Sequence, residues 1–189
     1  MTTEQLYEQL NYVNHSREKR LYYANLVLSH PEFIPNVIEV LFKTEDKISC
    51  KAAWVLEFMC GKNLNALLPY LDMFTSKIHT VHLDSAVRPV AKICEYLAKA
   101  NDNIENPTLK KALKLEYKER IISVCFDYLI NDEKIAPKAY AMNALYLFGK
   151  EFLWIHPELE VILRRDFQIQ SSGFKARARH ILKYINKKK

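Results

Sequence analysis

Apolar residues recur along four segments of the chain with the spacing of a single helix face. Positions at offsets of 0, 4, 7, 8 and 11 residues are apolar in the segments that begin at Ile48, Ala86 and Phe174. The segment that begins at Ile135 follows the same spacing, with Asn143 as its one polar exception. Apolar residues at these offsets form one stripe on an α-helix, which predicts four helices that each bury one face.

A second kind of segment precedes each of these four helices. Three begin with a proline, at Pro35, Pro69 and Pro157, and a fourth begins without one at Glu119. Proline is favoured at the first position of a helix, because its missing N–H would have no partner there. These starts are separated by 34, 50 and 38 residues, and those of the apolar stripes by 38, 49 and 39. The spacing predicts a helix pair of about 40 residues as the repeating unit.

Two stretches of the chain match each other without gaps. Residues 61–72 and 149–160 share Gly, Lys, Pro and Leu at equivalent positions, and an Asp in the first corresponds to a Glu in the second. Glycine enters the left-handed conformation that ends many helices at little cost. We therefore expect Gly61 and Gly149 to end helices in that conformation, each followed by a short linker to the next proline.

The predicted fold is an all-α superhelix of the HEAT or armadillo type, an α-α solenoid of about five helix pairs in a single domain over residues 1–189. Helices over residues 3–13 and 17–29 would form the first cap of the stack. Residues 100–117 are polar, contain an Asn-Pro turn and account for the one long unit, so we expect an insertion there. Residues 186–189 form a basic C-terminal tail.

Composition narrows the classes of protein that fit this fold. Of the 189 residues, 49% are apolar and 26% are charged, which is the balance of a soluble globular domain. The 3 glycines are too few for the Gly-rich loops that cradle phosphates. No stretch approaches the ~18–20 apolar residues of a membrane span, and Thr2 with Gln5 has the pattern of a capping box rather than a signal peptide. We therefore expect a cytoplasmic protein without membrane contact.

Neither the cysteines nor the histidines form a recognised metal or catalytic motif. The four cysteines are Cys50, Cys60, Cys94 and Cys125. They lie in apolar runs without a Cys-x-x-Cys pair, which predicts buried, reduced thiols. His79, His82 and Asp84 lie close together, but no third His or Cys is near, and Asp84 is expected to cap the following helix. We expect no metal, no cofactor and no catalytic residue.

Charge is distributed unevenly along the chain. Residues 164–189 contain nine basic residues against the single acidic residue Asp166, a net charge of +8. The rest of the chain therefore carries −2 of the total of +6. A local positive potential attracts anions, phosphate backbones and acidic protein surfaces. The candidate anion-binding residues are Lys175, Arg177, Arg179 and Lys183. The alternative is a solvated last helix whose lysines aid solubility.

The helices with apolar stripes also carry polar and aromatic residues on their opposite side. If the units stack, these residues form a row along one side of the molecule, usually the concave one. Cations, carboxylates and a tryptophan together resemble a protein- or peptide-binding groove, in which Trp and Arg anchor the partner. The candidate partner-binding residues are Lys51, Trp54, Glu57, Arg88, Lys92, Glu95 and Lys138. The alternative is a solvated face on which carboxylates pair locally with lysines.

Over nearly its full length the chain resembles HEAT-like α-helical repeat proteins. Residues 12–24, 46–58, 82–96 and 174–180 carry a closer resemblance. In these stretches the chain resembles a family of short cytoplasmic bacterial proteins commonly labelled adenylosuccinate lyase. The label implies a lyase, whose superfamily has a signature loop similar to Ser-Ser-x-Met-Pro-x-Lys-x-Asn. Residues 171–177 are the nearest match and lack its Met-Pro and Asn, so no catalytic residue is carried over.

Three functions of different classes fit these features. The leading expectation is a non-catalytic helical-repeat scaffold that binds a protein or peptide partner in its concave groove. The first alternative is nucleic-acid or phosphate binding through the basic C-terminal unit. The second alternative is the lyase activity that the family label implies. The sequence favours a binding protein over an enzyme, and it indicates no particular oligomeric state.

Overall fold

A computed structural model of the chain describes residues 2–103 and 107–186, and every regular element in these residues is helical. The α-helices are α1 (Thr3–Leu10), α2 (Arg17–Ser29), α3 (Ile34–Leu41), α4 (Ile48–Lys62), α5 (Leu71–Thr75), α6 (Asp84–Asp102), α7 (Pro107–Ala112), α8 (Leu115–Ile130), α9 (Ile135–Phe148), α10 (Ile155–Asp166) and α11 (Ser172–Asn186). Short 3-10 helices cover Pro31–Phe33, Leu64–Tyr70 and Ile78–Thr80. The predicted all-α class is confirmed.

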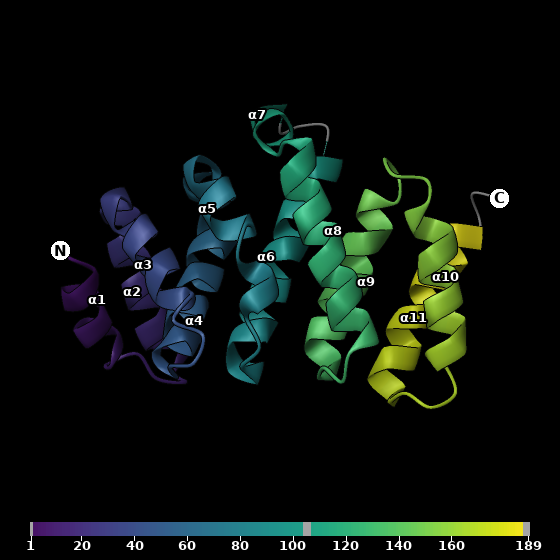
Figure 1. Ribbon diagram of the computed structural model, residues 1–189, viewed down its shortest axis with the longest axis horizontal. Helices are drawn as coiled ribbons and strands as arrows, with labels where there is room; N and C mark the ends of the chain where they lie inside the picture. Colours follow the sequence, from purple (N-terminus) through teal and green to yellow (C-terminus); the bar gives the residue numbers. More distant parts are fainter. Residues whose placement is uncertain (1, 104–106, 187–189) are drawn as a thin grey trace.

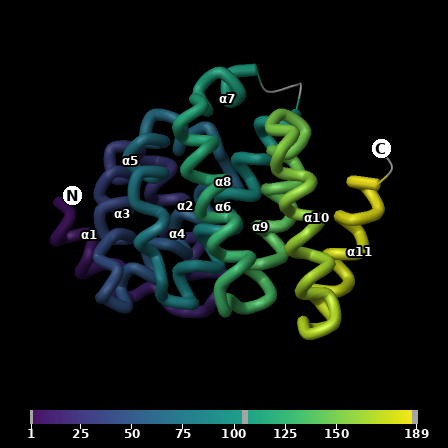
Figure 2. Tube along the Cα trace, turned by 45° about the vertical axis from the view of Figure 1, so that its right-hand side comes forward, coloured from purple at the N-terminus to yellow at the C-terminus, as the bar shows by residue number. Residues whose placement is uncertain are grey.

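The helices follow one another in chain order along the molecule, with α1 and α11 at opposite ends (Figure 1). One row of contacts joins α2 to α4, α4 to α6, α6 to α9 and α9 to α11. A second row joins α1 to α3, α3 to α5 and α5 to α8. Between the rows, α3 packs on α4 and α8 on α9, and α10 and α11 lie together at the C-terminal end (Figure 2). The buried apolar residues form one core cluster to which helices of both rows contribute.

The predicted apolar stripes form much of this core. In α4 every stripe residue from Ile48 to Met59 is buried, and in α6 every stripe residue from Ala86 to Leu97. The stripe of α11 is buried as well, except that Leu182 is half-buried. All four cysteines are buried and free, as predicted. In the part of the chain that the structure describes, no helix is both long and apolar enough to cross a membrane.

The predicted stripe of α9 is wrong by two positions. Ile135, its expected first residue, is 38% exposed, and Asn143 is half-buried. Apart from Met142, which is buried as predicted, the buried apolar residues have the expected offsets when they are counted from Pro137 instead. They are Pro137, Ala141, Ala144, Leu145 and Phe148. Asn143 signals the error in the sequence itself, because an amide in a buried stripe costs free energy unless it is hydrogen-bonded.

Some of the helix ends predicted from the sequence are confirmed and others are wrong. Thr2 and Gln5 form the predicted capping box, in which each side chain accepts a hydrogen bond from the backbone N–H of the other residue. The first helix ends at Leu10 rather than at residue 13, whereas the second has its predicted bounds. Leu83 occupies the cap position of α6 and Asp84 is the first helical residue, so the expected capping by Asp84 is wrong.

The segments that begin with proline are less regular than predicted. Pro35 is the second residue of α3 and Pro157 the third residue of α10. Pro69, however, lies inside the 3-10 helix Leu64–Tyr70, which precedes the short α5. Because this segment is mostly 3-10 helix, α5 before α6 has 5 residues, whereas α3 before α4 has 8 and α8 before α9 has 16.

The expected insertion at residues 100–117 is partly helical. Helix α6 continues to Asp102, α7 occupies the middle of the segment, and α8 begins at Leu115. Residues 104–106 of this segment and residues 187–189 of the predicted basic tail lie outside the described residues. The connection between α6 and α8 is therefore shorter than the polar sequence suggests.

Gly61 and Gly149 do not adopt the expected left-handed conformation. Neither has a positive φ angle, and Gly149 has φ −62° at the end of α9. Close neighbouring side chains, rather than a left-handed backbone conformation, account for a glycine at each of these two positions. A Cβ on Gly149 would overlap the ring of His156, and a Cβ on Gly61 would lie 3.3 Å from the hydroxyl of Tyr96.

Tyr128 of α8 carries a hydroxyl that the core does not satisfy. The residue is 4% exposed, and its Oη has no hydrogen-bond partner among the described residues. A buried hydroxyl without a partner costs free energy relative to a bare ring. We therefore expect Tyr128→Phe to raise the free energy of unfolding by about 1 kcal/mol in urea denaturation. Tyr70→Phe is the control, because the exposed Tyr70 hydroxyl lies 3.5 Å from the Pro31 carbonyl. A loss of stability in Tyr128→Phe would contradict the conclusion that the Tyr128 hydroxyl has no partner.

Candidate functional site

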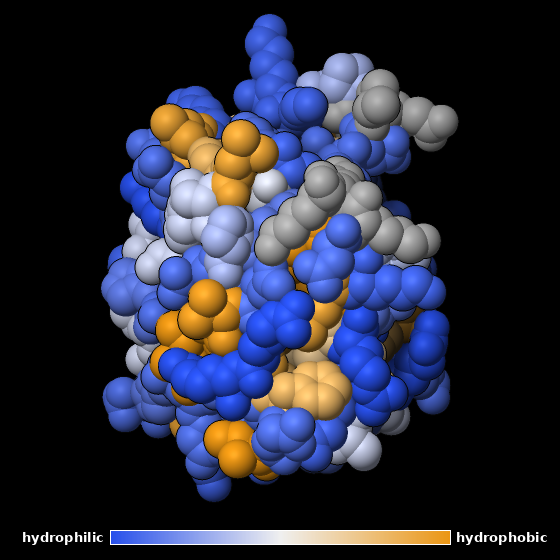
Figure 3. All heavy atoms as spheres, turned by 90° about the vertical axis from the view of Figure 1, so that its right-hand side faces the viewer, coloured by the Kyte–Doolittle hydropathy of each residue, from blue (hydrophilic) through white to orange (hydrophobic). Residues whose placement is uncertain are grey.

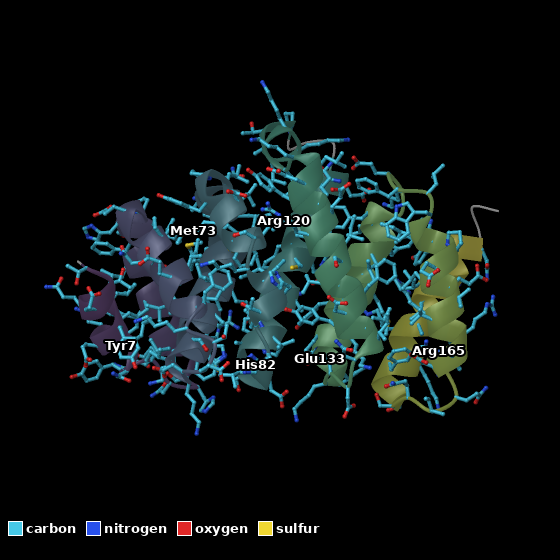
Figure 4. The ribbon with its side chains drawn as sticks, in the orientation of Figure 1. Tyr7, Met73, His82, Arg120, Glu133 and Arg165 are labelled. Atoms are coloured by element: carbon cyan, nitrogen blue, oxygen red, sulfur yellow. The ribbon has the colours of Figure 1, made fainter. Side chains whose placement is uncertain are left out.

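The N-terminal ends of α4, α6 and α9 lie along one edge of the molecule, and a cleft opens there. Figure 4 shows His82 and Glu133, from the turns before α6 and α9, on this edge. One part of the cleft, of about 550 Å³, lies between α4 and the start of α6. The other part, of about 620 Å³, lies between α2, α6 and the start of α9. Both parts are lined by Trp54, Asp84 and Ser85, and we refer to them together as the Trp54 cleft.

Trp54 joins three helices at the centre of this cleft. It is 8% exposed, and its indole N–H donates a hydrogen bond of 2.9 Å to the Ser85 carbonyl. The guanidinium of Arg20 lies over the indole at 4.5 Å from the ring centroid, and the His15 ring lies 5.0 Å away. A cation stacked on an indole in this way is attracted by the ring quadrupole. The indole therefore holds α2, α4 and the start of α6 in a fixed relation.

Glu57 and Arg88 form an ion pair beside the indole. Two hydrogen bonds of 2.7 and 3.3 Å join the terminal nitrogens of Arg88 to the two carboxylate oxygens of Glu57, which is 8% exposed. Arg20 lies close enough to interact electrostatically with both Arg88 and Glu57. Burial first, and then the Arg88 charge, hold the pKa of Arg20 below its ordinary value, and the Glu57 charge opposes them. The guanidinium groups of Arg20 and Arg88 thus both lie near the Glu57 carboxylate.

The rim of the cleft carries charges of both signs. Lys51 donates a hydrogen bond of 2.8 Å to the Asn11 carbonyl, and the exposed Lys134 and Asp84 lie 3.3 Å apart. An exposed ion pair of this kind contributes little to stability. Burial, and then the Asp84 charge, raise the pKa of Glu133 above its ordinary value.

Lys92 and Glu95 belong to a separate cluster between α6 and α9. Glu95 is 4% exposed and accepts hydrogen bonds from Lys92 at 2.6 Å and Asn143 at 2.7 Å, while Lys99 lies 3.0 Å away. The ammonium of Lys92 also lies 4.3 Å from the centroid of the Tyr140 ring. Burial alone would raise the pKa of Glu95, but the bonds from Lys92, Lys99 and Asn143 outweigh it and hold the pKa below its ordinary value. This cluster joins α6 to α9.

Lys138 does not lie on the predicted face. It is 3% exposed, and its Nζ donates a hydrogen bond of 3.2 Å to the Leu129 carbonyl. The prediction of an exposed groove residue is wrong here because the α9 stripe begins two residues later than expected. With the corrected stripe, Tyr140, Asn143 and Tyr146 occupy the offsets that Lys51, Trp54 and Glu57 occupy in α4. The corrected spacing could have identified Tyr140 and Asn143 from sequence.

The basic residues predicted on α11 are not all on one side. At 100° per residue, Lys175, Arg179 and Lys183 share a flank of the helix, and Arg177 lies on the opposite flank. Among the described residues, none of these four side chains has a carboxylate within ion-pair distance. Arg179 helps to line a cavity of about 370 Å³ between α10 and α11. Figure 3 views this end and shows hydrophobic side chains interspersed with hydrophilic ones.

His79, His82 and Asp84 do not converge. His79 is exposed on the 3-10 helix Ile78–Thr80, and His82 lies 3.2 Å from the Thr80 carbonyl and 3.8 Å from Glu45. Over residues 2–103 and 107–186, no group of three or more His, Cys, Asp or Glu side chains is arranged to hold a metal ion.

The structure divides the seven predicted groove residues into three groups. Lys51, Trp54, Glu57 and Arg88 are at the Trp54 cleft. Lys92 and Glu95 form the cluster between α6 and α9, and Lys138 is buried elsewhere. Arg20, which sequence reasoning missed, completes the cleft from α2.

Comparison with protein families, curated proteins and solved structures found no match to this chain.

Proposed function

We propose that this chain is a helical-repeat scaffold of the HEAT or armadillo type, with about five helix pairs, that binds a protein or peptide segment in the Trp54 cleft. Two rows of successive helix contacts support the repeat arrangement. The repeat spacing of the sequence and the buried stripes of α4, α6 and α11 support it independently.

The cleft itself is the observation that carries the binding proposal. Its two parts fall within the volume range of about 300–1,000 Å³ that is usual for ligand sites. Its floor is apolar, formed by Trp54 and Pro137, and the partly exposed Ile135 offers further apolar contact. Tryptophan and arginine are the residues that most often anchor protein partners, and here both are positioned by contacts within the chain. Ordered anchors reduce the entropy lost on binding.

A substitution that fills the cleft tests this proposal. The side chain of Ser85 is exposed and lines both parts, so Ser85→Trp should occupy the cleft without disturbing the core. We expect selection from a random peptide library to yield peptides that bind the wild-type chain and bind Ser85→Trp at least about tenfold more weakly. Thr108→Trp, on the exposed surface of α7, is the matched control and should bind these peptides as the wild type does.

Three results would decide the matter. Equal melting temperatures of Ser85→Trp and the wild type would show that the substitution acts on the cleft rather than on folding. A set of peptides that all bind Ser85→Trp as tightly as the wild type would overturn the proposal. A set that loses binding to Thr108→Trp as well would also overturn it, because α7 lies away from the cleft.

The basic flank of α11 supports a second candidate function, the binding of nucleic acid or phosphate. The supporting observation is that Lys175, Arg179 and Lys183 share one side of the helix without carboxylate partners among the described residues. Binding of this kind should weaken steeply with salt, because counterions are released from the phosphates. We expect duplex DNA to bind at low salt, and the triple variant K175E/R179E/K183E to abolish that binding. No binding at low salt would eliminate this candidate.

A further inference from the structure

We infer that the Trp54 cleft binds an acidic peptide, receiving the side-chain carboxylate of an Asp or Glu on the guanidinium of Arg20. The inference rests on the proposed function and adds to it the chemistry of the ligand. It begins with the bonding of Arg20, because a guanidinium has five N–H donors and a charge to satisfy.

Arg20 uses little of its bonding capacity within the chain. Its Nε donates one long hydrogen bond of 3.5 Å to the Asn14 carbonyl. In the described residues, neither of its terminal nitrogens has a hydrogen-bond partner, and no carboxylate lies within ion-pair distance of it. The ring of Trp54, and that of Phe58 at 5.8 Å, lie against the guanidinium. Stacking leaves the in-plane N–H groups available, so Arg20 presents an ordered and unpaired fork.

Among the described residues, the carboxylate that pairs with an arginine of the cleft is Glu57, and it is already engaged. Arg88 holds both oxygens of Glu57 with its own terminal nitrogens. Arg20 is therefore a second guanidinium beside a carboxylate that Arg88 already occupies. Burial and the Arg88 charge both disfavour its charged form, and an added anion would relieve this. A carboxylate matches the guanidinium fork with two parallel hydrogen bonds.

The charges around the cleft favour a single negative charge over two. Lys134 is paired with Asp84, and Glu133 lines the same part of the cleft as Arg20 without an ion pair in the described residues. A phosphate group, which carries about −1.5 to −2 charges, would therefore meet repulsion from these carboxylates. A carboxylate carries one charge, which one unpaired arginine balances.

The shape of the cleft favours an internal residue of the partner over a chain end. Its two parts share Trp54, Asp84 and Ser85, so an extended segment can occupy both. The apolar floor would then hold a neighbouring side chain of the peptide, while the carboxylate lies on Arg20. We therefore assign the anion to an Asp or Glu side chain rather than to a terminal carboxylate.

The test uses peptides from the screen above that bind the wild type but not Ser85→Trp, synthesised with both ends blocked. We expect Asp or Glu to be enriched at one position relative to the unselected library. Replacing that residue with Asn or Gln should weaken binding to the wild type about tenfold and leave binding to Arg20→Gln unchanged. Arg20→Lys keeps the charge without the fork and should show an intermediate effect. If Arg20→Gln does not fold, this lysine variant carries the comparison.

The outcomes separate this inference from the proposed function. Cleft-specific peptides that lack an enriched acid, or an Asn substitution that weakens binding to the wild type and the Arg20 variants equally, would overturn the inference alone. Tighter binding of the phosphoserine version, or of a peptide with a free terminal carboxylate in place of the acid, would also overturn it. If no peptide distinguishes Ser85→Trp from the wild type, the proposed function fails as well.

Discussion

Replacing Glu95 with alanine is expected to lower the free energy of unfolding by about 3 kcal/mol, the cost typical of breaking a buried ion pair. Its carboxylate is 4% exposed and bridges α6 and α9 through Lys92 and Asn143. Without it, the partly buried ammonium of Lys92 loses its carboxylate partner and lies between the rings of Tyr96 and Tyr140. Urea denaturation measures the loss, and Glu119→Ala, on the exposed surface of α8, is the control with an expected change near zero.

The same substitution should change the pH dependence of stability. The pKa of Glu95 is lowered on folding, so its contribution is complete above the ordinary value of 4.5 and is lost as the pH falls through the folded value. The difference in stability between the wild type and Glu95→Ala should therefore shrink as the pH falls below 4.5. A difference that stays constant from pH 7 to the acid limit of folding would contradict the role assigned to this carboxylate.

Replacing Gly149 with alanine is expected to cost about 2 kcal/mol, within the range for overpacking. The added methyl would overlap the His156 ring, which stacks on Tyr146 with ring centroids 5.5 Å apart. The His156 Nε2 is also hydrogen-bonded to the Tyr146 carbonyl at 2.8 Å, so the ring cannot move away without losing that bond. Thermal or urea denaturation of the single variant measures this cost.

Two further variants separate crowding from backbone effects at Gly149. Because its φ angle is negative, alanine is compatible with the backbone, and His156→Ala should recover most of the loss when combined with Gly149→Ala. Gly173→Ala, in α11, is the matched control, since its new methyl would lie 3.2 Å from the flexible Ile135 side chain rather than overlap a ring. If the double variant is as unstable as the sum of the two single variants, steric overlap is not the cause.

The sequence predicted buried residues best where the apolar pattern within a single helix decides which residues are buried. The stripes of α4 and α6 were predicted residue by residue, because every residue at the chosen offsets in these two helices is apolar. The α9 stripe was misplaced because α9 is apolar on several sides, so its spacing fits more than one frame. A polar residue within the chosen frame, Asn143, was the only local evidence against it.

The candidate site was predicted only in part, for a related reason. Trp54 and Arg88 could be found because they lie opposite the stripes of their own helices. The role of Arg20 depends on how α2 packs against α4, and no spacing within α2 predicts that contact. The pairing of Glu57 with Arg88 likewise joins two helices across a sequence separation of 31 residues.

The indole resonances of the two tryptophans give the most direct test of binding at the Trp54 cleft. Trp54 lies at the centre of the cleft, whereas Trp154 is 57% exposed and stacks on Phe126 of α8. In nitrogen-15 NMR spectra titrated with a selected peptide, we expect the Trp54 indole resonance to shift and that of Trp154 to stay in place. A peptide that binds without moving the Trp54 resonance, or that moves only that of Trp154, would contradict binding at the Trp54 cleft.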